Sequence, residues 1–105
     1  MASEDHEQRL ASLMRAALDG DETAYAAFLR DAAALVRRAT ARRLRESGGV
    51  SPEDVVQETL LAVHLKRDTW RTDEPILPWL FTIARYKAID AYRRRGVRIE
   101  LPVDE

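Results

Sequence analysis

The sequence predicts an all-α fold, a compact bundle of about four helices. Apolar side chains recur at helical spacing through most of the 105 residues, and the good helix formers Ala, Leu, Arg and Glu dominate the composition. Only four glycines and four prolines interrupt these stretches. A chain of this length forms about one domain and can bury a modest core without disulfides.

Residues 4 to 19 have the pattern of a first amphipathic helix, which Gly20 ends. We expect the acids and Gln8 on its polar side to be solvated. The apolar stripe of this helix consists of Leu10, Leu13, Met14, Ala17 and Leu18.

A second helix begins at Asp21-Glu22-Thr23 and continues to about Glu46, where Ser47-Gly48-Gly49 breaks it. Its apolar stripe consists of Tyr25, Phe28, Leu29, Ala32, Leu35, Val36 and Ala39. Its last part carries a run of cations: Arg37, Arg38, Arg42, Arg43 and Arg45. Cations stabilise the negative end of a helix, which gives the run a structural explanation. The functional alternative is a strip that faces phosphate.

The third helix is predicted over residues 52–66. Ser51 can accept hydrogen bonds from the first turn, Pro52 loses none there, and acids follow at the positive helix end. One stripe is apolar and consists of Val56, Leu60 and Val63. A second stripe consists of Asp54, Gln57, Glu58 and Leu61, which is either a solvated face or a docking surface.

The fourth helix is predicted from near Pro75 to about Arg95. Its apolar arc consists of Ile76, Leu77, Leu80, Ile83, Ala84, Ala88 and Ala91, and the opposite side carries Thr82, Arg85, Tyr86, Ile89 and Arg93. Trp79 and Tyr86 lie at the seam between the two. Rings beside Arg suit single-stranded nucleic acid, because bases stack on rings and guanidinium groups neutralise phosphate. Alternatively, Trp79 and Trp70 are the large residues of a small core.

Composition excludes several classes of protein. Without cysteine there is no disulfide framework or thiolate metal site, and His6 and His64 have no spaced partners for a metal. No apolar run approaches the roughly 20 residues of a membrane span. The start MASEDHEQ is acidic and unlike a signal peptide, so we expect a cytoplasmic protein without cofactors. Six basic residues lie between residues 85 and 98, against the single acid Asp90.

Four motifs resemble, in order and spacing, region 2 of the extracytoplasmic-function (ECF) sigma factors, the promoter-specificity subunits of bacterial RNA polymerase. They are VVQET at 55–59, WLFTIAR at 79–85, AID at 88–90 and RRR at 93–95. The resemblance covers about residues 20 to 96. It implies a region 2 domain over residues 1–96, which binds core polymerase and recognises and melts the promoter minus-ten element without enzymatic chemistry.

Residues 97–105 alternate apolar with polar side chains and are interpreted as the start of an interdomain linker. Family members carry a second domain after this linker, a helix-turn-helix that reads the minus-thirty-five element. The sequence ends before it, so we interpret the chain as an isolated domain.

The resemblance assigns two sets of contacts. Helix 52–66 would dock on the clamp helices of the largest polymerase subunit through Asp54, Gln57, Glu58 and Leu61. The loop 68–74 and the following helix would read the non-template strand, with one base flipped into a pocket at the loop. The DNA-binding residues would be Trp70, Arg71, Thr72, Asp73, Trp79, Arg85, Tyr86, Asp90, Arg93 and Arg94.

Within this set, Arg85, Arg93 and Arg94 would hold phosphate. Asp90 would accept from an exocyclic amine or orient an arginine, or else form a local ion pair with Arg93 or Arg94. The chain departs from the family pattern at two positions. Ile76 stands where the family often has an aromatic residue, which affects only the shape of the core. Tyr86 stands where the family often has Asn, so the resemblance does not say which base is read.

The resemblance also implies an anti-sigma factor as a partner, and no membrane insertion by this chain itself. Two alternatives from other classes stay open. One is a helical protein-interaction module, for example one that binds only an anti-sigma factor and never recognises DNA. The other is a small enzyme, which would need a convergent cluster of titratable groups that the sequence does not indicate.

Overall fold

The computed structural model describes residues 2–44 and 50–94, which form four α-helices and one short 3₁₀-helix. They are α1 (Ala2–Leu18), α2 (Glu22–Leu44), α3 (Pro52–Lys66), η1 (Arg67–Thr69) and α4 (Ile76–Arg94). The all-α prediction is confirmed. The predicted linker, Arg95 and the break at residues 47–49 lie outside the described residues.

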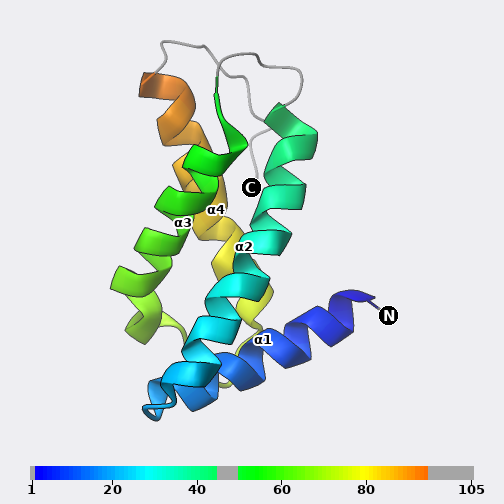
Figure 1. Cartoon of the computed structure of the whole chain (residues 1–105), viewed down its shortest axis with the longest axis vertical. Coiled ribbons are helices and arrows are strands. Elements are labelled where there is room, and N and C mark those ends of the chain that lie inside the picture. Colours follow the sequence, from blue (N-terminus) through cyan, green and yellow to red (C-terminus); the bar gives the residue numbers. More distant parts are fainter. Residues whose placement is uncertain (1, 45–49, 95–105) are drawn as a thin grey trace.

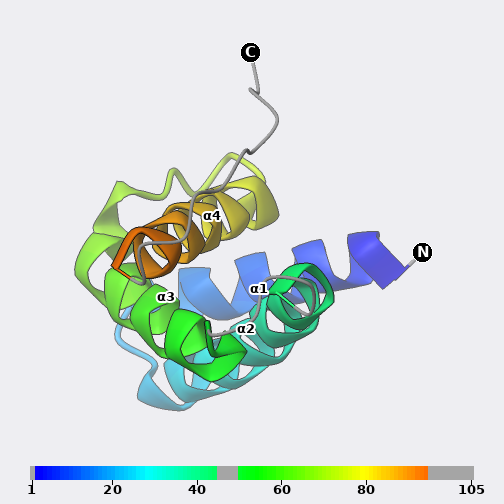
Figure 2. The same ribbon diagram turned by 90° about the horizontal axis from the view of Figure 1, so that it is seen from above.

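Three of the helices run side by side, and the first crosses them. In Figure 1, α2, α3 and α4 follow the long axis of the molecule, while α1 crosses their lower end. Figure 2, seen from above, shows α3 between α2 and α4. The path of α1 brings it against both α2 and α4. Helix α1 therefore lies beside the segment that leads into α4.

Helix ends follow local sequence signals with one exception. Gly20, at φ 103°, ends α1 in the left-handed conformation, and the Asp21 carboxylate accepts a hydrogen bond from the Ala24 N–H at 2.9 Å. The prediction that the Ser51 side chain caps α3 was wrong, because its hydroxyl makes no capping hydrogen bond. Pro52 brings no N–H to this turn, and the Ser51 carbonyl accepts from Val55 at 3.3 Å.

The core forms where the four apolar stripes meet. Its largest fully buried side chains come from all four α-helices: Leu10, Met14, Phe28, Val36, Val55, Val56, Thr59, Val63, Ile76 and Leu80. Each large apolar side chain contributes roughly 1.5–3 kcal/mol by leaving water. The predicted stripes therefore supply most of this core, although two of their members, Leu18 and Ala39, are exposed.

Helix α3 buries a second stripe that the sequence analysis did not identify. Val55, Thr59 and Ala62 are buried alongside Val56 and Val63. The Thr59 hydroxyl donates to the Val55 carbonyl at 2.7 Å, so its burial leaves no unsatisfied donor. Two buried stripes are expected for a helix packed between two neighbours, as α3 is between α2 and α4.

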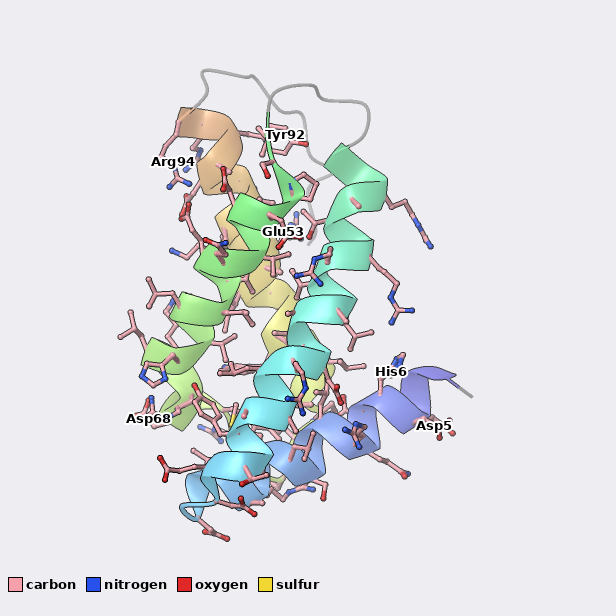
Figure 3. The ribbon with its side chains drawn as sticks, in the orientation of Figure 1. Asp5, His6, Glu53, Asp68, Tyr92 and Arg94 are labelled. Carbon is pink, nitrogen blue, oxygen red and sulfur yellow. The ribbon has the colours of Figure 1, made fainter. Side chains whose placement is uncertain are left out.

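An ion pair joins α2 to α3 at the surface. The Arg37 guanidinium donates to both carboxylate oxygens of Glu53, which lies in the first turn of α3 (Figure 3). Arg38 and Arg42 are exposed, and the side chains of Arg43 and Arg45 lie outside the described part. At Arg37, the basic run of α2 therefore has a structural role.

Within the described residues, no helix has the length and apolar character of a membrane span.

This ion pair predicts a pH dependence. The hydrogen bond from Arg37 lowers the pKa of Glu53, so the pair stabilises the fold above the pKa that Glu53 has in the unfolded chain. That stability is lost as the pH falls through the lowered pKa of the folded state. We expect Arg37→Gln to raise the pKa of Glu53 to its ordinary range, measured by carboxyl NMR titration. Arg38→Gln is the matched control and should leave it unchanged.

Candidate functional site

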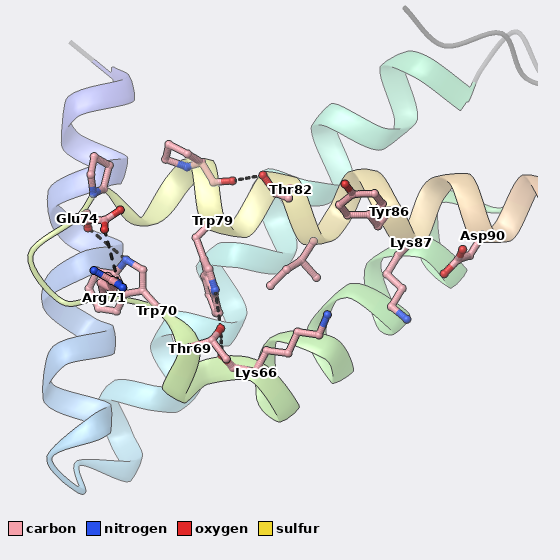
Figure 4. Close-up of a pocket in the computed structure, with 13 residues that line it drawn as sticks. Lys66, Thr69, Trp70, Arg71, Glu74, Trp79, Thr82, Tyr86, Lys87 and Asp90 are labelled. Carbon is pink, nitrogen blue, oxygen red and sulfur yellow. Dashed lines mark hydrogen bonds and ion pairs between the residues drawn. The ribbon is translucent and has the colours of Figure 1, made fainter. Parts of the chain in front are cut away.

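A groove of about 810 Å³ lies between the end of α3, the loop that follows η1, and the first four turns of α4. Figure 4 shows its lining side chains in close-up. Five of the predicted DNA-binding residues line it: Trp70, Arg71, Trp79, Tyr86 and Asp90. The fold therefore brings residues that are 20 positions apart in the sequence to one concave surface.

The two tryptophans have different positions in the groove. Trp70 is 4% exposed and belongs to the hydrophobic core, and its indole N–H donates to the Glu74 carbonyl at 3.1 Å. This matches the alternative interpretation of Trp70 as a core residue. Trp79 is half-buried, and its indole N–H donates to the Thr69 hydroxyl at 3.2 Å. Both rings are thus oriented by hydrogen bonds.

Tyr86 is the exposed ring of the groove. Its side chain is 63% exposed, and it lies two turns along α4 from Trp79 (Figure 4). The Thr82 hydroxyl between them donates to the Pro78 carbonyl at 2.7 Å. An exposed ring beside a half-buried one offers a surface on which a planar base can stack.

Positive charge reaches the groove from residues that the sequence analysis did not select. Lys66, at the end of α3, and Lys87 of α4 both line it and point toward the space between the helices (Figure 4). Lys87 had been counted only as part of the basic run of the last helix. Lys66 could have been predicted from the sequence, because it lies in the last turn of the helix before the predicted binding loop.

The predicted phosphate-binding arginines do not line the groove. Arg85 is half-buried and Arg93 is exposed, both on α4. Arg94 pairs with Glu58 of α3, rather than with the Asp90 named in the alternative. Figure 3 shows Arg94 at the upper end of α4, far from the loop. Any role of these three arginines is therefore outside the groove itself.

The loop itself is short and internally bonded. The Glu74 N–H donates to the Arg71 carbonyl at 3.0 Å, and the side chains of the same two residues form an ion pair at 3.9 Å. Thr72 and Asp73, also predicted to bind DNA, are exposed but do not line the groove. They are therefore not part of this concave surface.

A second surface lies along the outside of α3. Asp54 and Gln57 are exposed, Glu58 is half-buried, and Leu61 is 60% exposed. Leu65, one turn further and 71% exposed, extends this surface and was missed, although its spacing of four from Leu61 could have indicated it. We call these five residues the α3 outer face. Among its polar side chains, Asp54 and Gln57 are exposed, whereas Glu58 is partly covered and pairs with Arg94 of α4.

His64 lies at the surface and contacts Tyr25. His64 is exposed, and its Nδ1 shares a hydrogen bond of 2.8 Å with the Tyr25 hydroxyl. Partial burial raises the pKa of Tyr25, and nearby Arg67 partly offsets this. Across residues 2–44 and 50–94, no group of three His, Asp or Glu side chains is placed to hold a metal ion.

Comparison with known proteins now identifies the domain. The family model of sigma-70 region 2 matches residues 24–98. The chain belongs to the sigma-70 region 2 family. Over 101 residues it is 46% identical to the ECF RNA polymerase sigma factor SigF of Caulobacter vibrioides, an alignment that covers 96% of the chain. The aligned part is 56% of the relative, so the chain spans about half of that protein's length. No solved structure matches.

In the sigma region 2 groove, the buried ring of Trp70 and the exposed ring of Tyr86 should contribute differently to the free energy of unfolding. We expect Trp70→Ala to lower the free energy of unfolding by about 3–5 kcal/mol, because it empties part of the core. Tyr86→Ala should change it by no more than about 0.5 kcal/mol, since its ring is exposed. Urea unfolding followed by circular dichroism measures both. Equal losses in the two variants would contradict the different positions of the rings.

Proposed function

We propose that this domain works as region 2 of an ECF sigma factor in transcription initiation. In this proposal the α3 outer face docks on the clamp helices of the largest subunit of core polymerase, and the groove receives unstacked bases of the non-template minus-ten element. The domain performs no covalent chemistry and acts in the cytoplasm, where polymerase and promoter meet. A promoter is opened because unstacked bases are trapped as they emerge.

The observation that carries the proposal is the groove. Two rings of different exposure, Trp79 and Tyr86, lie in it beside two lysines, and the loop forms its wall. Stacking on a ring contributes about 1–3 kcal/mol per base, and lysines reduce the repulsion between phosphates. Asp90 lines the same groove and could accept from the exocyclic amine of a base. Arg93 and Arg94 would meet phosphate beyond the groove.

The α3 outer face has the composition of a docking surface. Its exposed leucines form an apolar centre, and the exposed Asp54 and Gln57 can pair with arginines of a partner helix. Family membership supports a polymerase partner, and the ECF relative supports an anti-sigma factor as a further one. A domain that binds only an anti-sigma factor is the alternative that the DNA experiment below distinguishes.

Gln57 offers a clean test of polymerase binding. It is exposed, so Gln57→Ala should leave the fold intact and weaken the complex with core polymerase by about 5- to 30-fold, the effect of roughly 1–2 kcal/mol at an interface. Surface-immobilised core polymerase measures the affinity. Gln8→Ala, which removes an exposed amide from α1, is the matched control. Unchanged binding by Gln57→Ala and Leu61→Ala together would remove the assignment of α3. Glu58→Ala is less suitable because it also deprives Arg94 of its partner.

DNA recognition is tested on the complex of this domain with core polymerase. A single-stranded oligonucleotide library selects the preferred sequence, and its affinity is measured against salt concentration. Tyr86→Ala should weaken the selected sequence about tenfold, by losing a stacking surface. Lys66→Gln should weaken all sequences alike and reduce the salt slope by about 0.7, the value for one phosphate contact on a single strand.

Arg30→Gln is the control for charge, since Arg30 is an exposed cation on α2, away from the groove. It should leave both the selected sequence and the salt slope unchanged. A library that yields no sequence preference, together with no effect of Tyr86→Ala, would favour the protein-interaction module instead.

A further inference from the structure

The first turn of α4 has backbone amides that need a hydrogen-bond acceptor from outside the helix. Pro75 and Pro78 carry no N–H, which leaves the amides of Ile76 and Leu77 as donors at the start of the helix. No acidic side chain lies in this turn. Both amides donate instead to the carboxylate of Glu7 in α1, at 2.7 and 2.9 Å. Helix α4 is thus capped by a residue that is about 70 positions away.

A second side chain of α1 holds the loop before this helix. The Arg15 guanidinium donates twice to the Thr72 carbonyl, at 3.1 and 2.9 Å. The same guanidinium lies 5.7 Å from the centre of the Trp70 ring, within the range of a cation–π contact. Glu7 and Arg15 lie two turns apart on one helix, and they bind the two ends of the segment from Trp70 to Leu77.

The side chains of Glu7 and Arg15 do not themselves line the groove. No residue of α1 lines the groove, yet the segment that α1 holds contributes Trp70, Arg71 and Glu74 to it. Helix α1 also precedes residues 24–98, the part that the family model matches. Its effect on the groove is therefore indirect and comes from outside the region by which the family is recognised.

We propose that Glu7 and Arg15 are positioning residues, which fix the loop 70–75 and the start of α4 in the conformation that accepts a base. This inference rests on the proposed function of the groove. A loop that is already ordered loses less conformational entropy when DNA binds, so the anchors increase affinity without touching DNA. They also increase discrimination, because selection among bases requires a groove of fixed shape.

The experiment uses the complex of this domain with core polymerase and the single-stranded sequence selected by wild type. We expect Arg15→Ala to weaken binding of that sequence about tenfold, through loss of preorganisation. The preference over scrambled oligonucleotides should shrink while the salt slope stays unchanged, since Arg15 is bonded to protein and not to phosphate. Arg15→Lys keeps the charge and one donor and should restore part of the preference. Arg30→Ala, which removes an exposed cation elsewhere, should have no effect.

Hydrogen exchange of the free domain provides a readout independent of DNA. The Glu74 amide, which bonds to the Arg71 carbonyl, should exchange faster in Arg15→Ala, and the Leu77 amide faster in Glu7→Gln. Glu7→Gln keeps one oxygen acceptor and so is expected to remain folded. Amides of the α2 core should exchange as in wild type in both variants.

The outcomes separate the two proposals. If wild type selects a sequence and Arg15→Ala selects it equally well, the positioning inference is overturned while the groove keeps its function. A reduced salt slope in Arg15→Ala would also overturn it, because Arg15 would then be a phosphate contact. If wild type selects no sequence, the proposed function fails, and the inference fails with it whatever the exchange rates show.

Discussion

The arrangement of the site depends on one interaction, in which the Glu7 carboxylate of α1 accepts hydrogen bonds from the first amides of α4. Two prolines remove local N–H groups from this turn, and no side chain within it can cap the two that remain. The positive end of the α4 macrodipole faces the same carboxylate. Helix α4 supplies Trp79, Tyr86 and Asp90 to the groove. Its starting point therefore decides where these side chains lie.

Sequence signals within single turns predicted most of the fold. They could not predict contacts between residues far apart in the chain. Gly20 and the Asp21 carboxylate act within their own turn, so the sequence pattern was enough to place the boundary between α1 and α2. The acids of α1 were expected to be solvated, whereas Glu7 is half-buried against α4. Nothing in the spacing of residues 7 and 76 indicates that they meet.

Two other differences concern α3. Thr59 looks polar in a pattern of apolar residues, but its hydroxyl bonds to its own helix, which allows a second stripe of α3 to be buried. Ser51 looked like a helix cap, but its hydroxyl makes no capping bond, and nothing in the structure explains this. The candidate site was predicted best on α4, where Trp79, Tyr86 and Asp90 share the groove. The positively charged residues of the site were predicted least well. Lys66, which was not predicted, lines the groove, whereas Arg94, which was, pairs with Glu58.

The anchoring contacts from α1 involve backbone atoms of the segment they hold. Arg15 binds the Thr72 carbonyl, and Glu7 binds the amides of Ile76 and Leu77. Every residue except proline has such a carbonyl and amide, so the path of the loop does not depend on the exposed side chains at positions 72 and 73. Exchange of these side chains during evolution would change the chemistry of the exposed surface while its framework persists. A fold built in this way tolerates changes at these two positions without altering the course of its backbone.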